Sequence, residues 1–155
     1  MTDYPTNVWT SDLYDLGEGV RAARLTRTEG SQLVAGVWEL DPGASVVYHL
    51  HHGTEEYLLV LRGRLTLRTP DGERKLTDGD VVHFPKGRDG AHGTRNDGDA
   101  VVRYLVAAHH GTPEVIEYPE TGFVVVGAKT PSFDGSPLEL RFHAADAVDD
   151  AERSG

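Results

Sequence analysis

Glycine and proline interrupt this chain so often that few segments are long enough for anything but a short strand. The 155 residues include 18 glycines and 8 prolines. Turn-forming pairs such as Asp71-Gly72 and Asp97-Gly98 separate apolar segments at intervals of about ten residues. This spacing is typical of a β-sandwich or a β-barrel. We therefore expect an all-β fold.

Between the turns, β-branched and apolar residues form short segments of the kind that makes strands. The expected strands are residues 20–27, 31–40, 45–50, 56–62, 64–69, 73–77, 80–84, 91–96, 100–108, 115–118, 123–128 and 138–142. A chain of this length can bury enough surface to fold as one unit without covalent cross-links. We expect a single domain over 1–155, with a barrel core at about 20–110, further strands in 111–143 and a flexible tail at 144–155.

Charge and composition restrict the partners and the compartment. The formal net charge is -10, from 25 acidic and 15 basic side chains, which disfavours nucleic acid and anionic membrane surfaces as partners. The N-terminal sequence has neither the basic nor the apolar region of a signal peptide, and no apolar segment reaches the length of about 20 residues that spans a bilayer. The absence of cysteine fits a reducing compartment. We expect a cytoplasmic protein.

The segment "HLHHGTEE", residues 49–56, concentrates possible metal ligands at the start of an apolar strand. His49 and His51 are two residues apart and so share one face of a strand, where two imidazoles can converge on one ion. His52 points the other way. Glu55 and Glu56 face opposite sides of the next strand, so only one of them can join the histidines. Apolar residues follow on both faces of this strand, so the alternation of side chains does not show which of Glu55 and Glu56 joins the histidines.

His92 is a further candidate ligand. It follows an expected strand that ends at Pro85 and a loop that Gly87 and Gly90 permit. A histidine in such a place is, by itself, more often an ordinary surface or turn residue. Only its combination with the first segment makes it a candidate metal ligand.

The two segments together resemble the two sequence motifs of the cupin superfamily. The first reads Gly43, five residues, His49, one residue, His51, four residues, Glu56, six residues, Gly63. The second reads Gly79, five residues, Pro85, one residue, Gly87, four residues, His92, three residues, Asn96. The gap between Gly87 and His92 is longer by two residues than the commonest form in the family. That departure leaves room for the loop to reposition His92 slightly.

The resemblance implies a double-stranded β-helix, or jelly roll, with a metal ion held inside by His49, His51, Glu56 and His92. It also favours Glu56 over Glu55 as the carboxylate ligand. Three neutral imidazoles and one carboxylate suit a divalent first-row ion, such as iron, manganese, nickel, copper or zinc. The sequence does not choose among these metals.

A metal-dependent enzyme acting on a small organic molecule, of the dioxygenase or isomerase type, is the function that the resemblance favours. The alternatives are a non-catalytic cupin that binds or senses a small molecule and a barrel that serves only to dimerise. We find no nucleophile elbow or phosphate-binding glycine loop that would offer another mechanism. No helix-turn-helix is expected before the barrel, which argues against a regulator. Catalytic residues other than the ligands stay unassigned, and so does the role of the segment after His110.

The remaining notable side chains are expected to serve packing or solubility. Both faces of the strand at 56–62 look buried, so the Tyr and Leu side chains after Glu56 are expected in the core, and the outer face is expected to meet a second subunit in a homodimer. His83 is expected to pack within its strand rather than line the barrel, and Asn96 to be structural. The other expectations are a surface position for His109 and His110, a solvated face or salt bridges for Arg62, Arg64 and Arg68, and closure of the barrel or contact with a second subunit for Trp9 and Trp38.

Overall fold

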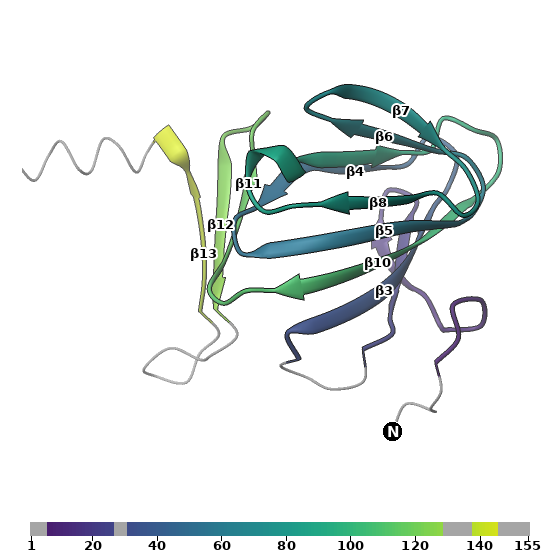
Figure 1. Ribbon diagram of the computed structural model, residues 1–155, viewed down its shortest axis with the longest axis horizontal. Coiled ribbons are helices and arrows are strands. Elements are labelled where there is room, and N and C mark those ends of the chain that lie inside the picture. Colours follow the sequence, from purple (N-terminus) through teal and green to yellow (C-terminus); the bar gives the residue numbers. More distant parts are fainter. Residues whose placement is uncertain (1–5, 27–30, 129–137, 146–155) are drawn as a thin grey trace, which may run out of the picture.

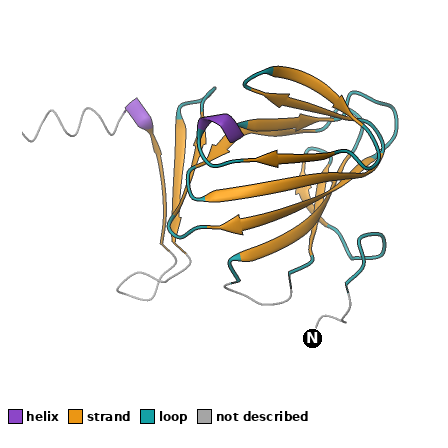
Figure 2. Cartoon of the chain, in the orientation of Figure 1, coloured by secondary structure: helices purple, strands orange, loops and turns teal. Residues whose placement is uncertain are grey.

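The structure is a computed structural model that describes residues 6–26, 31–128 and 138–145. Strands make up almost all of its regular structure (Figures 1 and 2), which confirms the expected all-β class. The strands are β1 (Tyr14–Gly17), β2 (Val20–Arg24), β3 (Leu33–Leu40), β4 (Ser45–His51), β5 (Thr54–Arg62), β6 (Leu65–Thr69), β7 (Gly72–Leu76), β8 (Val81–Phe84), β9 (His92–Arg95), β10 (Val102–His110), β11 (Glu114–Tyr118), β12 (Phe123–Ala128) and β13 (Leu138–His143). One short 3-10 helix, η1 (Arg88–Gly90), precedes β9.

The strands form two antiparallel sheets. One has six strands in the order β1-β2-β3-β10-β5-β8, and the other has seven in the order β13-β12-β11-β4-β9-β6-β7. Figure 1 shows β3, β10, β5 and β8 side by side across one face, with β11, β12 and β13 at the left-hand end. In the middle of each sheet, neighbouring strands such as β10 and β5, or β4 and β9, come from distant parts of the chain, as in the expected jelly roll. Among the described residues, no helix is long and apolar enough to cross a membrane.

The expected strands agree with the observed ones except at their ends and at two short elements. The strand β1 was not expected, because its four residues are all exposed and carry no apolar alternation. The helix η1 was not expected either, and it accommodates the longer gap before His92. Residue 27, the expected end of one strand, and residues 146–155 of the expected tail lie outside the described residues. The extent of the domain therefore stays a prediction.

The hydrophobic core includes the inward face of β5. Along β5 the inward side chains are Glu56, then Leu58 and Val60, and the two apolar side chains are each 1% exposed. Leu65 and Leu67 of β6 and other buried apolar residues pack with Leu58 and Val60 in the same cluster. Because one strand face carries both the carboxylate and the core, packing of the core fixes the position of Glu56.

Asn96 ties the end of β9 to two neighbouring segments. It is fully buried, and its amide nitrogen donates to the carbonyl oxygens of Leu40 and Ala100, each at 2.9 Å. Its side-chain oxygen accepts a hydrogen bond from the Gly98 amide at 2.9 Å. Every polar atom of the side chain is thus satisfied. This arrangement confirms the structural role expected of Asn96.

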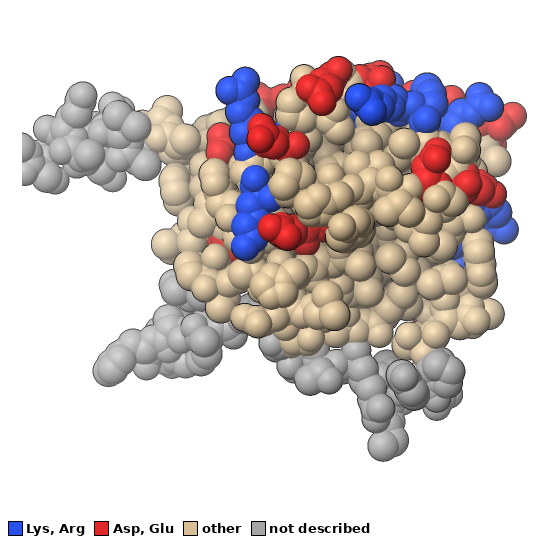
Figure 3. Space-filling view, in the orientation of Figure 1, with Lys and Arg blue, Asp and Glu red and all other residues tan. Residues whose placement is uncertain are grey.

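The outer face of β5 is not buried within the described part of the chain. Tyr57 is 54% exposed, and its ring lies 4.8 Å from that of His83, which is also exposed. The expectation of a core position for Tyr57 is therefore wrong. His83 packs against Tyr57 and does not line the cavity described below, as expected, but it is exposed rather than buried. Figure 3 shows Lys, Arg, Asp and Glu gathered along the upper edge, over β6 and β7, whereas the middle of the face over β5 and β10 is largely uncharged. A second subunit on this face stays a prediction.

The other expected surface residues lie largely as expected. His109 is exposed and His110 is half-buried at the end of β10. Arg68 forms an ion pair with Glu120 at 2.5 Å, and Arg62 lies over the Trp9 ring at 5.7 Å. These contacts match the solvated face and salt bridges predicted for the arginines.

Candidate metal centre

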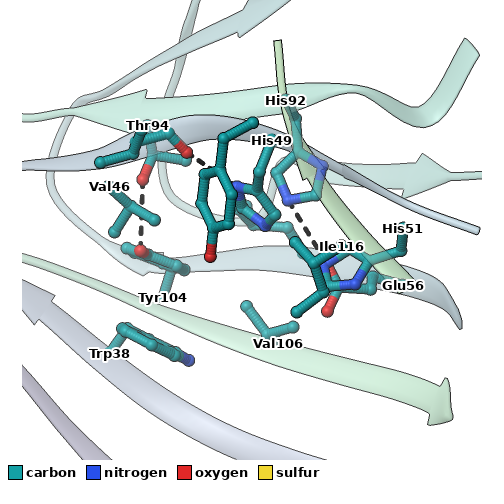
Figure 4. Close-up of a pocket in the computed structure, with 13 residues that line it drawn as sticks. Trp38, Val46, His49, His51, Glu56, His92, Thr94, Tyr104, Val106 and Ile116 are labelled. Atoms are coloured by element: carbon teal, nitrogen blue, oxygen red, sulfur yellow. Dashed lines mark hydrogen bonds and ion pairs between the residues drawn. The ribbon is translucent and has the colours of Figure 1, made fainter. Parts of the chain in front are cut away.

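The four residues predicted as metal ligands lie together inside the barrel (Figure 4), although they come from both sheets. His49 and His51 project from one face of β4, and their ring centroids are 4.9 Å apart. His92 of β9 is paired directly across from His49, with 4.6 Å between the ring centroids. Glu56 reaches the three histidines from β5 in the other sheet. Pairing within one sheet and packing between sheets thus both contribute to the cluster.

Glu56 is the carboxylate that faces the histidines. Its Oε2 atom lies 3.2 Å from Nε2 of His92 and 3.7 Å from Nε2 of His51. One donor atom from each of His49, His51 and Glu56 lies within 4.8 Å of the others. Glu55 is exposed on the opposite face of β5. The structure therefore agrees with the choice that the two-motif resemblance implied and that strand alternation left open.

Backbone carbonyls fix the orientation of two imidazoles. Nδ1 of His49 lies 2.7 Å from the Val47 carbonyl oxygen, and Nδ1 of His92 lies 2.8 Å from that of Gly90. A carbonyl oxygen can only accept, so each Nδ1 carries a proton and donates. Nε2 is then the ring atom left to face the interior of the cluster. At His92 this nitrogen faces a carboxylate oxygen, so either a proton on the nitrogen or a metal ion bound by both groups would make the contact favourable.

The segment before His92 is held in place by close backbone packing. Gly90 in η1 is buried, and a Cβ atom added there would lie 1.7 Å from the Pro85 carbonyl oxygen. The ring of Phe84 stacks on that of His92 at 3.8 Å with an angle of 10° between the planes. The longer gap in the second motif is therefore taken up by η1, and His92 still lies opposite His49.

Burial favours the neutral form of His49 and His51. It lowers the pKa of His51 to about 4, although the charge of Glu56 works in the opposite direction. Burial, followed by the neighbouring His92, also lowers the pKa of His49. For Glu56, burial alone would raise the pKa of the carboxyl, but the hydrogen bond from His92 and the nearby histidines outweigh it and lower that pKa. At neutral pH the cluster thus holds neutral imidazoles at His49 and His51 and a carboxylate, the protonation states that metal coordination requires.

Glu114 lies behind His51 and was not singled out in the sequence. Its Oε1 atom is 3.6 Å from Nδ1 of His51, a buried atom without a hydrogen-bond partner among the described residues. Glu114 also accepts hydrogen bonds from the Gly53 amide and the Thr54 hydroxyl. Burial raises the pKa of its carboxyl. Its position on β11, beyond both motifs, gives no local signal that it reaches this cluster.

The four side chains line one side of a cavity of about 340 Å³. Its other walls are mainly apolar or aromatic and comprise Trp38, Val46, Val47, Leu58, Thr94, Tyr104, Val106, Ile116 and Tyr118. Trp38, which was expected to close the barrel or reach a second subunit, lines this cavity (Figure 4). Two of these lining residues, Ile116 and Tyr118, lie on β11, so the segment after His110 contributes directly to the candidate site.

The shifted pKa of His51 predicts an acid sensitivity of the metal-free protein. Its ordinary pKa of 6.5 falls to about 4 on folding, so between these pH values the unfolded chain binds more protons than the folded one. The free energy of unfolding should therefore decrease as the pH falls through this window, by on the order of 3 kcal/mol from His51 alone. Urea unfolding at pH 7, 6, 5 and 4.5 after treatment with a chelator measures it.

His51→Gln should make this pH dependence shallower, whereas His52→Gln, which changes an exposed neighbour, should leave it unchanged. Equal slopes for His51→Gln and the unsubstituted protein would contradict the assignment of the shift to His51.

Comparisons with known proteins agree with this arrangement. Residues 36–108 match the family model of the cupin domain. Among solved structures, the chain is similar to a sugar phosphate isomerase of the cupin superfamily from Silicibacter pomeroyi, with a TM-score of 0.70 and 27% identity over 83% of this chain and 78% of that one. A putative sugar phosphate isomerase from Acidithiobacillus ferrooxidans gives a TM-score of 0.65 and 26% identity, covering 79% of this chain and 78% of that one.

The polyketide cyclase RemF from Streptomyces resistomycificus has the same fold, with a TM-score of 0.60 and 21% identity over 73% of this chain and 84% of that one. None of the curated proteins matches the chain. The family match covers both motifs, and the solved structures share the two-sheet barrel around them. The chain therefore belongs to the cupin superfamily and carries a small cupin domain of the double-stranded β-helix type.

Proposed function

We propose that this cupin is a metal-dependent enzyme acting on a small organic molecule, with a divalent transition metal held by His49, His51, Glu56 and His92. The observation that carries the proposal is the convergence of imidazole nitrogens and one carboxylate on the wall of a largely apolar cavity. The donor set fits the metal, because Nε2 of His92 and Oε2 of Glu56 lie 3.2 Å apart in a buried cluster, where one divalent cation would be a partner of both. Iron, manganese, nickel, copper and zinc all suit such donors.

The chain's own residues would set the geometry of the reaction. The carbonyl oxygens of Val47 and Gly90 fix two of the rings, and Phe84 stacked on His92 limits its rotation. The apolar walls exclude water from a bound substrate, which strengthens electrostatic interactions with it. A metal bound there would supply a Lewis acid for a carbonyl or enol oxygen, or a means of activating dioxygen if it is redox-active.

The isomerase type and the dioxygenase type are both compatible with these donors. The two neighbours named as sugar phosphate isomerases, at 27% and 26% identity, support isomerisation. One observation favours a binding or sensing module instead: outside the four donors, no described residue that lines the cavity is a carboxylate, histidine or lysine. A general base for turnover would then have to come from the donors, a tyrosine or the substrate.

Metal content tests the ligand set. Elemental analysis after gentle purification should find about one divalent metal ion per chain, and His51→Ala combined with His92→Ala should abolish it, since two of four donors are lost. The matched control is His52→Ala combined with His83→Ala, which removes two exposed histidines and should retain the metal. An unchanged metal content in the His51 and His92 double variant would refute this site.

Glu114→Gln should weaken metal affinity about tenfold, because a carboxylate beside the remote nitrogen of a ligating histidine orients the ring and raises its basicity. Glu117→Gln on the same strand is the control, since Glu117 pairs with the exposed His52 at 3.2 Å. Competition with a fluorescent zinc chelator measures both affinities. Equal affinities for the two variants would show that Glu114 does not act on the metal through His51.

Activity is tested by a substrate screen on protein loaded separately with iron, manganese, nickel and zinc. Oxygen uptake reports a dioxygenase, and product formation without oxygen uptake reports an isomerase. We expect turnover in at least one metal form and its loss in the His51 and His92 double variant. Tight ligand binding without turnover in every metal form would favour the binding or sensing module.

A further inference from the structure

We propose that the cavity beside the four donors takes an uncharged aromatic or conjugated molecule that presents an oxygen atom to the metal, and that it does not take a sugar phosphate. The inference deepens the proposed function, on which it rests for the metal. It concerns the walls of the cavity rather than the donors.

The walls away from the donors are suited to a flat apolar group. In Figure 4, Trp38, Tyr104 and Val106 lie across the cavity from His49 and His92. The ring of Tyr118 lies 6.0 Å from that of His49 and is tilted by 32°, so an aromatic surface also extends from the donors toward β11. Aromatic and aliphatic walls bind apolar rings through buried area and ring contacts.

The cavity walls away from the donors carry few polar groups, and some of these already form hydrogen bonds within the protein. The hydroxyls of Thr94 and Tyr104 hydrogen-bond to each other at 3.3 Å, and Tyr104 is 3% exposed. A sugar would bring several hydroxyl groups into this cavity, and each one buried without a partner would weaken binding. The walls therefore offer too few partners for a carbohydrate.

Apart from the metal itself, no cationic side chain of the described cavity lining would meet a phosphate group. No lysine or arginine is among its described lining residues, and Glu56 is anionic. Phosphate recognition normally uses arginine or lysine side chains, or the amides at a helix N-terminus. An adjoining cavity of about 330 Å³ shares Trp38, Glu56 and Val106 with the first, and its one arginine, Arg24, already has an interaction partner. The charges around the cavity therefore argue against a sugar phosphate as its ligand, although two similar structures are named as sugar phosphate isomerases.

The size of the cavity also limits the ligand. At about 340 Å³ it lies at the small end of ligand pockets. A molecule of roughly one or two rings fills such a volume at protein-like packing density. The expected ligand is therefore compact, with a ring against Trp38 and Tyr118 and an oxygen atom near the donors.

Two diketones separate the contribution of the ring from that of the oxygen donors. Benzoylacetone and acetylacetone carry the same oxygen groups, but the first has a phenyl ring where the second has a methyl group. Calorimetric titration of zinc-loaded protein should give a dissociation constant at least about tenfold lower for benzoylacetone, because the ring buries more apolar surface. Fructose 6-phosphate, the third probe, should bind more weakly than benzoylacetone.

Variants at two tyrosines assign the effect to the cavity. Tyr118→Ala should reduce the preference for benzoylacetone over acetylacetone several-fold without weakening acetylacetone. Tyr48→Ala is the matched control and should leave the preference unchanged, because Tyr48 lies on the outer face of β4, where Arg68 covers its ring at 4.4 Å.

The outcomes also separate this inference from the metal assignment. Equal affinities for the two diketones, or tighter binding of fructose 6-phosphate, would overturn the inference even if zinc is bound. Failure to hold zinc would overturn the metal assignment alone, since the preference for the ring can still be measured on the metal-free protein. There the same order of the two diketones is expected.

Discussion

A carboxylate buried among imidazoles is the constraint on which this structure depends. Glu56 lies between the two sheets with His51 and His92 beside its Oε2 atom. A buried charge is stable only with compensating partners, and here the partners come from β4 and β9 while the charge comes from β5. The inward face of β5 continues into Leu58 and Val60. The apolar core that adjoins this polar cluster therefore holds in place a buried carboxylate that is unfavourable by itself.

How far the sequence predicts this arrangement depends on whether a feature is local. The period of a strand places His49 and His51 on one face, and the turn residues place most strand boundaries. The choice of Glu56 over Glu55 is not local, because apolar residues follow both, and it depended on the resemblance to cupin motifs. Tyr57 was predicted in the core because its segment is apolar on both faces, yet no described part of the chain covers it.

The residues that sequence reasoning missed are those that reach the site only through pairing between distant strands. Glu114 and Tyr118 lie on β11, which reaches the cavity because Ile116 pairs with His51 of β4. The five residues of β11 have an ordinary strand composition, and nothing in them predicts the pairing with β4. The match to the cupin family ends at residue 108, before β11 begins. The family motifs thus predict the donors, whereas part of the cavity wall comes from a segment that they do not describe.

The position of β11 also has a consequence for how the two halves of the site affect each other. The same short strand carries Glu114 behind His51 and Ile116 and Tyr118 in the cavity wall, and it pairs with β4 at Ile116 and Glu117. A molecule that moves this strand outward also moves the carboxylate away from His51. Binding of an organic molecule and binding of a metal are then thermodynamically linked, and each must change the affinity for the other by the same factor.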